Sequence, residues 1–450
     1  MSLYTRAVSS LLFPLHERLK GHGTVAARRA LERSQWLPAA ELRARQLDDL
    51  RGFLETVAAG VPYYRRLFAE RGFDPQELTG LDGIRQLPLL DKAAIRAHGD
   101  AMTRDGATGL ARSNTGGSSG EPLVFLIGRE RVSHDVAAKW RATRWWGVDI
   151  GDREIVVWGS PIELGAQDRL RILRDRLLRS ELLSAFEMSP ENLRRFVARI
   201  RAVRPAMLFG YPSSLSKIAE FAEGEGIALQ DCGIRVAFVT SERLYDYQRE
   251  TISRVFACPV ANGYGGRDAG FIAHECPRGS LHVTAEDIVL EILDREGRPL
   301  PAGQAGEIVV THLRTADFPF IRYRTGDIGV LSEVPCACGR GLPVLASVEG
   351  RSTDFVVAAD GTVLHGLALI YVLRDMPEVS NFRIVQESLE KTRVQVVVRG
   401  QLTNTLVTAI RRGLAARLGE QVTIEVEAVP ELVPEASGKF RYVVSRVGSA

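Results

Sequence analysis

Three short runs rich in β-branched and aromatic residues constrain the fold of this chain most. They cover residues 153–160, 205–214 and 234–242, and each is followed by a segment with helical spacing of apolar residues. Strands that alternate with helices form parallel sheets, and such sheets bind ligands at the carboxyl ends of their strands. The sequence therefore predicts an α/β fold with a ligand site at that edge.

Two further segments have other patterns. Residues 1–110 carry apolar residues at helical intervals and predict mostly helices. The runs "DIVLEIL", "GEIVVTHL" and "DIGVLSE", which lie between residues 287 and 333, alternate with turn signals and predict antiparallel strands. Because 450 residues exceed what one hydrophobic core usually supports, we predict a large domain over residues 1–350 and a second domain after it.

The C-terminal segment predicts this second domain. β-Rich runs at 381–388, 393–400 and 422–429 surround a helical segment with four apolar residues on one face, Leu406, Ile410, Leu414 and Leu418. We expect a small α+β domain over residues 351–450.

Composition excludes some classes of protein. With 58 basic and 55 acidic side chains the net charge is +3, which gives no indication of a nucleic-acid partner. Five cysteines without a secreted-scaffold spacing favour a reducing, cytoplasmic setting. The apolar N-terminal stretch is interrupted by Pro14 and fits neither a signal peptide nor a membrane span. We interpret the Arg-rich run at 169–179 as a solvated helix face, with an interaction patch as the alternative.

The loop "SNTGGSSGEP", residues 113–122, combines three glycines with three serines and one threonine. Such a loop lets backbone N–H groups converge on an anion, and the hydroxyls add donors, so phosphate is the expected ligand. No Gly-Lys-Ser/Thr ends the loop and an apolar strand follows it, which excludes a Walker A loop and a Rossmann fingerprint. A flexible surface loop is the alternative.

Three cysteines and a histidine suggest a metal site. Cys276, His282, Cys336 and Cys338 make a ligand set suited to tetrahedral Zn²⁺, and a site closed by four protein ligands would be structural. Buried reduced cysteines are the alternative, and His274 competes with His282 for the fourth position.

Six motifs occur in a fixed order: "SNTGGSSGEP", "TSERL", "NGYGGRDAG", "FIRYRTGD", "VEGRSTDF" and "EASGKFR". Together they resemble the motif set of the adenylate-forming superfamily of acyl-CoA synthetases and adenylation domains. "HECPRGSLHV" and "CACGRGLP" are similar to the branch of phenylacetate-CoA ligases, coenzyme F390 synthetases and CapK-like proteins, and this similarity favours His282 as the metal ligand.

The resemblance implies an AMP-forming carboxylate–CoA ligase. Such an enzyme joins an aryl or acyl acid to AMP with loss of pyrophosphate, uses ATP, Mg²⁺ and CoA, and often forms a homodimer. Two alternatives remain: a transferase that passes AMP or the acyl group to a hydroxyl, amine or carrier protein, and a non-catalytic ATP-binding descendant. Dependence on CoA separates the ligase from the transferase.

The resemblance also assigns nucleotide contacts. Tyr264 would stack on adenine, Asp327 would accept hydrogen bonds from both ribose hydroxyls with support from Arg351, and the glycine-rich loop would clamp the β- and γ-phosphates. Glu242 and Asn262 would border the adenine or the acid pocket, with turn capping as an equal alternative. The implied ATP-binding residues are Thr115, Gly116, Gly117, Ser118, Ser119, Gly120, Glu242, Asn262, Tyr264, Gly265, Asp327 and Arg351.

The catalytic positions depart from the family pattern in part. Arg267 stands where a hydroxyl residue usually contacts the α-phosphate, and Asp268 where a glutamate usually holds Mg²⁺. Lys439 matches the mobile lysine that bridges the carboxylate and the nucleotide. The family's lysine after the phosphate loop is missing, and Thr353 occupies its usual hinge position. The expected acid pocket contains Tyr211, Ser213 and Gly263.

Overall fold

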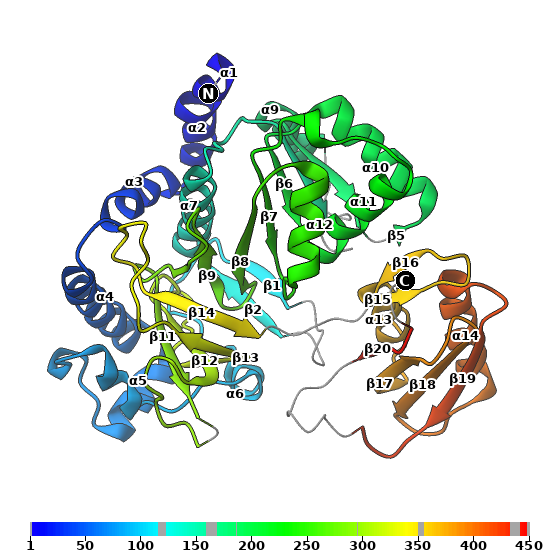
Figure 1. Cartoon of the computed structure of the whole chain (residues 1–450). Helices are drawn as coiled ribbons and strands as arrows, with labels where there is room; N and C mark the ends of the chain where they lie inside the picture. The colour runs from blue at the N-terminus through cyan, green and yellow to red at the C-terminus, as the bar shows by residue number, and fades with distance from the viewer. Residues whose placement is uncertain are drawn as a thin grey trace.

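The computed structural model describes residues 2–115, 123–158, 169–185, 187–294, 296–349, 355–432 and 442–447. The chain forms a large N-terminal part and a smaller C-terminal part, drawn in orange and red in Figure 1. This mixed α/β architecture confirms the predicted fold class.

Five parallel strands form one half of the large sheet. Their order is β4-β3-β6-β7-β8, and their bounds are Ser180–Ser184, Glu154–Trp158, Met207–Gly210, Val236–Thr240 and Val260–Gly266. Strands β3, β6 and β7 are the three predicted runs. Helices α10 (Pro190–Val203), α11 (Pro212–Gly224) and α12 (Asp246–Phe256) contribute to the apolar core of this half and lie together in Figure 1.

Antiparallel strands continue the same sheet. From β8 the order runs β9-β10-β14-β13-β12-β11, with bounds Gly270–Glu275, Leu281–Val283, Val344–Glu349, Tyr323–Leu331, Ala305–His312 and Ile288–Leu293. The three runs predicted as antiparallel are β11, β12 and β13. The β8–β9 hairpin joins them to the parallel half, so the large part has one eleven-stranded sheet, a continuity that the local pattern did not show.

The N-terminal residues are mostly helical, as predicted. The helices are α1 (Leu3–Ala7), the π-helix η1 (Val8–Leu12), α2 (Phe13–Leu19), α3 (Thr24–Ser34), α4 (Ala39–Gly60), α5 (Pro62–Arg71) and α6 (Lys92–His98), with 3₁₀ turns η2 (Pro75–Glu77) and η3 (Leu81–Gln86). Leu50, Phe53 and Leu54 of α4 share an apolar core with Ile308 and Val310 of β12. Residues distant in sequence therefore bury the antiparallel half of the sheet.

The phosphate-loop candidate connects two strands. β1 (Ala111–Asn114) pairs antiparallel with β2 (Val124–Ile127), and the described flank Thr115 exchanges hydrogen bonds with Leu123 at 3.0 Å in both directions. α7 (Arg129–Trp145) begins directly after β2. The expected strand after the loop is therefore present. No helix within the described residues has the length and apolar character needed to cross a bilayer.

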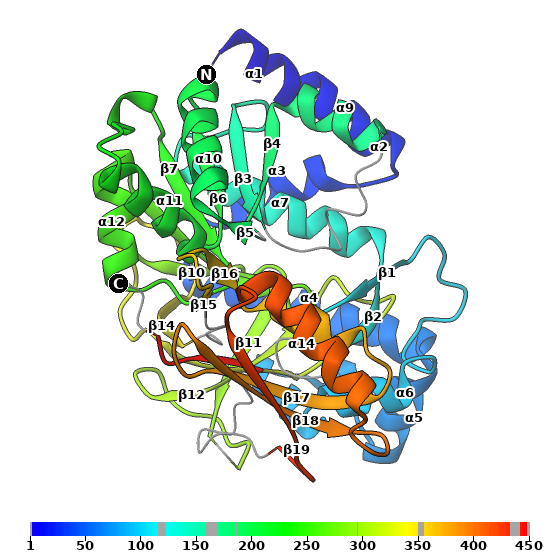
Figure 2. The same cartoon turned by 90° about the vertical axis from the view of Figure 1, so that its right-hand side faces the viewer.

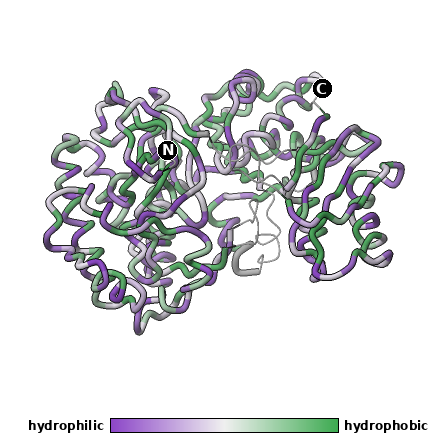
Figure 3. The backbone as a smooth tube through the Cα atoms, turned by 90° about the horizontal axis from the view of Figure 1, so that it is seen from below, coloured by the Kyte–Doolittle hydropathy of each residue, from purple (hydrophilic) through white to green (hydrophobic). Residues whose placement is uncertain are grey.

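The C-terminal part has its own sheet and core. Its strands are ordered β19-β18-β17-β20 over Thr423–Ala428, Lys391–Val398, Val379–Gln386 and Val443–Ser445, and its helices are α13 (Leu367–Arg374) and α14 (Asn404–Leu418). The four apolar residues predicted to share a face of α14 are all buried in this core. Figure 3 shows the smaller part beside the large one. The boundary near residue 350 stays a prediction.

One short sheet joins the two parts. β15 (Phe355–Val357) and β16 (Val363–His365) of the C-terminal part form a sheet with β5 (Glu187–Met188) of the large part, in the order β15-β16-β5. Val363 is paired with Met188 and Leu364 with Glu187. The orientation of the smaller part is thus held by backbone pairing.

Candidate active site and metal centre

The carboxyl ends of β6, β7 and β8 lie side by side and bring several predicted site residues to one edge. Gly210 pairs with Val239, and Thr240 pairs with Gly263. Just beyond these ends, the hydroxyl of Ser213 donates a hydrogen bond to the carboxylate of Glu242. Two predicted residues from different loops are therefore in contact at the edge where a ligand is expected.

Tyr264 and Asp327 meet at the same edge. The Tyr264 hydroxyl donates to Asp327 Oδ2 at 3.1 Å and lies 3.5 Å from the hydroxyl of Thr325. Burial, together with the adjacent Asp327 carboxylate, raises the pKa of Tyr264 well above its ordinary value. The Tyr264 ring is thus held through a neutral hydroxyl that is hydrogen-bonded to the Asp327 carboxyl group. The structure brings together the two residues assigned to adenine and ribose.

The turn that follows β8 positions Arg267 and Asp268. The buried Tyr323 donates its hydroxyl to Asp268 Oδ2 at 2.6 Å. Arg131 of α7, which is 2% exposed, donates to the backbone carbonyl of Arg267 at 2.6 Å. Asp268 also acts electrostatically on Tyr264, so both carboxylates of the site influence this ring. Arg267 and Asp268, the two predicted site residues that depart from the family pattern, therefore lie on a turn held by Arg131 on one side and Tyr323 on the other.

Close packing explains two glycines of the motif. A Cβ on Gly265 would lie 2.3 Å from the carbonyl oxygen of Gly270 on β9, and a Cβ on Gly263 would lie 2.9 Å from the ring of Phe238. Neither position can accept a side chain without displacement of its neighbour. Asn262 contributes its backbone N–H, which donates to the carboxylate of Glu275 at 2.8 Å.

Aromatic rings stack across β3 and β6. The rings of Trp158 and Tyr211 are 4.4 Å apart and nearly parallel, and the rings of Trp158 and Phe209 are also stacked, 6.0 Å apart. Trp140, by contrast, packs edge-on against Phe13 of the N-terminal helices. Trp158 and Tyr211 therefore lie at the predicted edge, and Trp140 belongs to the core.

Several predicted residues lie outside the described part of the chain. They are Gly116, Gly117, Ser118, Ser119, Gly120, Arg351, Thr353 and Lys439. Their assigned roles stay predictions.

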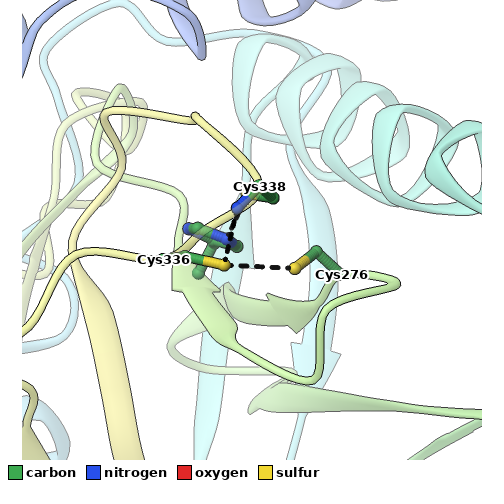
Figure 4. A group of neighbouring side chains, drawn as sticks. Cys276, Cys336 and Cys338 are labelled. Atoms are coloured by element: carbon green, nitrogen blue, oxygen red, sulfur yellow. Dashed lines mark hydrogen bonds between the residues drawn. The ribbon is translucent and has the colours of Figure 1, made fainter.

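The predicted metal ligands come together. The ligand atoms of Cys276, His282, Cys336 and Cys338 all lie within 4.8 Å of one another. Cys276 follows β9, His282 belongs to β10, and the other two cysteines lie between β13 and β14. The sulfur atoms of Cys276 and Cys336 are 3.7 Å apart, and Figure 4 shows these two side chains pointing toward each other. The gathered ligands fit a closed four-ligand centre.

The surroundings of this cluster orient its ligands. Backbone N–H groups of Arg278 and Cys338 lie 3.4 Å from the sulfurs of Cys276 and Cys336. His282 Nδ1 lies 3.3 Å from the carbonyl of Leu342, which leaves Nε2 directed at Cys338 Sγ, 3.2 Å away. Burial lowers the pKa of His282 to about 4, so its ring is neutral.

His274 lies apart from the cluster. It pairs with both Gly263 and His282 across neighbouring strands, and its fully buried ring stacks on Phe271 at 5.4 Å. The choice of His282 over His274 therefore agrees with the geometry. Trp145 packs edge-on against His282 at 5.9 Å and covers the cluster from α7.

Comparison with known proteins supports the resemblance seen in the motifs. Residues 356–446 match the CapK C-terminal domain family. The chain is 23% identical over 399 residues to Protein CapK of Staphylococcus aureus, a match that covers 88% of this chain and 87% of CapK. It is 25% identical over 445 residues to the phenylacetate-coenzyme A ligase of Thermus thermophilus, which covers 91% of this chain and 97% of that ligase.

The chain is thus similar over most of its length to CapK and to the phenylacetate-coenzyme A ligases. Solved structures show the same fold. 2-Hydroxyisobutyryl-CoA ligase in complex with 2-HIB-AMP and CoA in the thioesterification state superimposes with a TM-score of 0.65, at 22% identity over 92% of this chain and 91% of that one. The same ligase in a postadenylation state gives 0.61 at 23% identity and the same coverage. The resemblance to CapK-like proteins and phenylacetate-coenzyme A ligases that the motifs predicted is confirmed by these similarities.

Sequence reasoning missed three residues of the candidate site. Tyr323 and Thr325 lie inside the motif "YRTGD", where they were not assigned, although the tyrosine that begins this motif could have been considered as a partner for Asp268. Arg131 gave no signal, because its contact with the Arg267 carbonyl joins residues 136 positions apart.

Proposed function

We propose that this protein is an AMP-forming carboxylate–CoA ligase. The observation that carries the proposal is the contact of Tyr264 with Asp327 at the carboxyl edge of the parallel strands, beside the turn that holds Asp268. An aromatic ring and an ionised two-oxygen acceptor suit adenine and the two ribose hydroxyls of ATP. Similarity to phenylacetate-coenzyme A ligases over most of the chain supports the same reaction class.

The first step makes an acyl-adenylate. A carboxylate oxygen of the acid attacks the α-phosphorus of ATP, the bond from that phosphorus to the bridging oxygen breaks, and pyrophosphate leaves with the electron pair. The protein has to hold two anions together and neutralise phosphate charge. We assign this work to Arg267 at the α-phosphate, to the loop that begins at Thr115, and to Lys439.

Asp268 would hold Mg²⁺. Its carboxylate is a hard oxygen ligand, and the Tyr323 hydroxyl bonded to one oxygen fixes its orientation. A bound Mg²⁺ would supply positive charge to the triphosphate. Tyr264 and Asp327 would orient the nucleotide beside this ion. The Asp268 carboxylate acts electrostatically on Tyr264, and the hydroxyl of Tyr264 is bonded to Asp327.

The second step forms the thioester. The thiol of CoA loses its proton to solvent, its sulfur attacks the carbonyl carbon of the acyl-adenylate, the bond from that carbon to the phosphate oxygen breaks, and AMP leaves with the electron pair. The C-terminal part, which carries Lys439, would act as a lid that changes orientation between the two steps.

Aromatic acids are the substrates that the site favours. Trp158 is the last residue of β3, and Tyr211 directly follows β6. Their rings stack at the same edge of the sheet as Glu242 and Ser213. A flat ring packs well against such side chains. Phenylacetate-like acids are therefore the first acids to test.

The decisive experiment measures exchange of labelled pyrophosphate into ATP with a panel of carboxylic acids. We expect exchange with at least one aryl acid, and thioester formation when CoA is added. Lys439→Ala should lower exchange by about 100-fold or more, while Lys217→Ala, which removes a partly exposed lysine of helix α11, should leave it unchanged. Exchange that is insensitive to Lys439→Ala contradicts the assignment. Exchange without any CoA-dependent product points to a different acceptor.

We further propose that Cys276, His282, Cys336 and Cys338 bind a structural Zn²⁺. Thiolate and imidazole ligands within 4.8 Å fit tetrahedral Zn²⁺, and the N–H groups directed at sulfur support the thiolates. The purified protein should contain about one zinc per chain. Cys336→Ser should remove the zinc and lower the melting temperature, whereas Cys232→Ala should keep it. Wild-type protein without stoichiometric zinc would refute this centre.

A further inference from the structure

The outer face of the N-terminal helical arm, residues 3–19, is apolar where a surface helix is normally polar. The buried face of the arm includes Phe13 and Glu17. Leu11, Leu15 and Leu19 follow one another at intervals of four residues on the opposite side and are 68%, 56% and 80% exposed. Three consecutive turns therefore present leucine to the outside, and Figure 1 shows the arm at the upper end of the molecule.

The charges on this arm are all basic on its exposed side. Arg6, Arg18 and Lys20 are exposed, and Arg18 and Lys20 flank Leu19 in the sequence. Glu17 is the one acidic residue among residues 1–20, and it is buried, where it accepts a hydrogen bond from Thr24. Within residues 2–20 the exposed leucines thus lie among basic side chains, and no carboxylate of this segment is exposed.

Helix α9 (Arg169–Leu178) extends the same surface. Leu173 and Leu177, one turn apart, are 55% and 47% exposed, and Arg176 is exposed beside them. The Tyr4 hydroxyl donates to the carbonyl of Leu177 at 2.8 Å, and the Arg179 guanidinium lies 3.6 Å from the centre of the Tyr4 ring. These contacts hold α9 against the arm, and Figure 2 shows the two lying together. The one acid of α9, Asp175, is paired with Arg174 at 2.5 Å.

We propose that this basic–leucine face, made of Leu11, Leu15, Leu19, Leu173 and Leu177 with Arg6, Arg18, Lys20 and Arg176, docks the protein on anionic phospholipid bilayers. An amphipathic helix that lies flat on a membrane places its leucines at the boundary of the acyl chains and its arginines and lysines at the phosphates. The face has the composition for both contacts.

Charge decides between a bilayer and a second copy of this chain. A symmetric dimer through this face would bring its basic residues toward the same residues of the partner, without an exposed acid of the arm to pair with them. An anionic lipid surface supplies the missing negative charge. The contact is expected to be reversible and sensitive to salt, because it combines a few leucines with surface charges.

The experiment is flotation of the full-length protein with vesicles. Vesicles of phosphatidylcholine alone are compared with vesicles of equal parts phosphatidylcholine and phosphatidylglycerol. We expect about tenfold more protein to float with the anionic vesicles at low salt, and high salt to reduce that fraction. The triple variant Leu11→Ser, Leu15→Ser, Leu19→Ser should lose this binding, and Arg18→Gln with Lys20→Gln should weaken it.

Matched controls separate docking from damage to the fold. Val334→Ser with Leu389→Ser removes two exposed apolar side chains elsewhere and should leave flotation unchanged. Arg43→Gln with Arg66→Gln removes two exposed charges on α4 and α5 and should do the same. All variants should keep the melting temperature and the pyrophosphate exchange of the wild type, because none lies at the nucleotide site.

Three results would overturn the proposal. In the first, the protein does not float with anionic vesicles. In the second, it floats equally well when the three leucines are replaced. In the third, light scattering finds a dimer that the leucine variant abolishes, while neither protein binds vesicles. The last result would assign the face to a protein interface. A failure to detect acyl-adenylate formation would leave the vesicle result unaffected.

Discussion

The contact between Tyr264 and Asp327 combines a residue of β8 with one of β13, strands from the two halves of the large sheet. Thr325 fixes the backbone of β13 next to Asp327. Its hydroxyl donates to the carbonyl of Ile308 at 2.7 Å and accepts from the N–H of Asp327 at 3.1 Å. The carboxylate is therefore held in place before any nucleotide binds. In the proposed function, preorganisation of this kind would lower the cost of binding the ribose of ATP.

Asp327→Asn is expected to raise the KM for ATP in pyrophosphate exchange, with about a 100-fold loss of kcat/KM. The amide retains the shape but can accept only at one atom. Tyr264→Phe keeps the ring and should cost about tenfold or less. Asp294→Asn, in a surface turn, is the control. An unchanged KM in Asp327→Asn would remove this residue from the nucleotide site.

A second residue-scale prediction concerns pH. His134 Nδ1 of α7 lies 2.7 Å from Asp287 Oδ1. Burial lowers the pKa of His134, and the nearby Arg314 lowers it further. The Asp287 carboxylate, with a smaller contribution from Glu130, raises the pKa by more than this, so the pKa of His134 lies above its ordinary value. The folded chain thus holds this proton more tightly than the unfolded chain, whose histidine titrates at about 6.5. The stabilisation is complete below that pH and is lost as the pH rises through the raised value.

His134→Gln should therefore reduce the free energy of unfolding by about 2 kcal/mol at pH 6 and by less at pH 9. Urea denaturation at the two pH values measures the difference. In the Asp287→Asn background the same substitution should have no pH-dependent effect. An equal loss at both pH values would show that the charge on His134 does not contribute.

At the scale of elements, the β8–β9 hairpin links the parallel and antiparallel halves of the sheet and carries the motif tyrosine and aspartate. Its strands approach closely at Gly265, where an added Cβ would lie 2.3 Å from the carbonyl oxygen of Gly270, and the register shifts between Tyr264 and Gly265. Any side chain at Gly265 would press on the backbone of β9. The position of the catalytic turn therefore depends on the absence of one methyl group.

Gly265→Ala is expected to destabilise the protein by about 1–3 kcal/mol and to lower pyrophosphate exchange, because the hairpin has to open to admit the methyl group. Thermal unfolding and exchange assays measure the two effects. Gly52→Ala is the matched control, since no atom lies within 4 Å of its added Cβ, and it should be neutral or stabilising in helix α4. A Gly265→Ala protein with wild-type stability would contradict this packing.

Local sequence patterns predicted which segments form helices and strands better than they predicted which strands pair with each other. The three parallel runs and the inward face of α14 followed from periodicity, and the metal ligands followed from residue type, because cysteine and histidine carry their chemistry visibly. The joining of both halves into one sheet depends on the pairing of Gly263 with His274 and of Leu281 with Leu345. Such pairings are non-local, so periodicity does not encode them. Arg131 and Tyr323 were missed for the same reason.

At the scale of the whole molecule, the C-terminal part contacts the large part through a very short strand. The pairing of β16 with β5 involves two residue pairs, Val363 with Met188 and Leu364 with Glu187. The C-terminal part keeps its own core, built on α13, α14 and the sheet of β17–β20. A contact this small can break while both cores remain intact, as a change of lid orientation requires.

Hydrogen exchange tests this expectation, which depends on the proposed reaction. Amides of Met188 and Leu364 should exchange at different rates in the free protein and after addition of ATP, acid and CoA. Amides of β18 should serve as the control, because this strand is paired on both sides within the C-terminal sheet. Identical protection of β5 and β16 in both states would show that the two parts keep one orientation.

The place of β14 in the large sheet has a consequence for how the chain acquires its structure during synthesis. β14 lies between β10 and β13, and its Leu345 shares a core with Leu50 and Phe53 of α4. The N-terminal helices thus leave the ribosome long before the strands that bury their leucines and phenylalanines. A nascent chain that ends before Val344 exposes this unfinished surface, which makes such chains natural clients of chaperones.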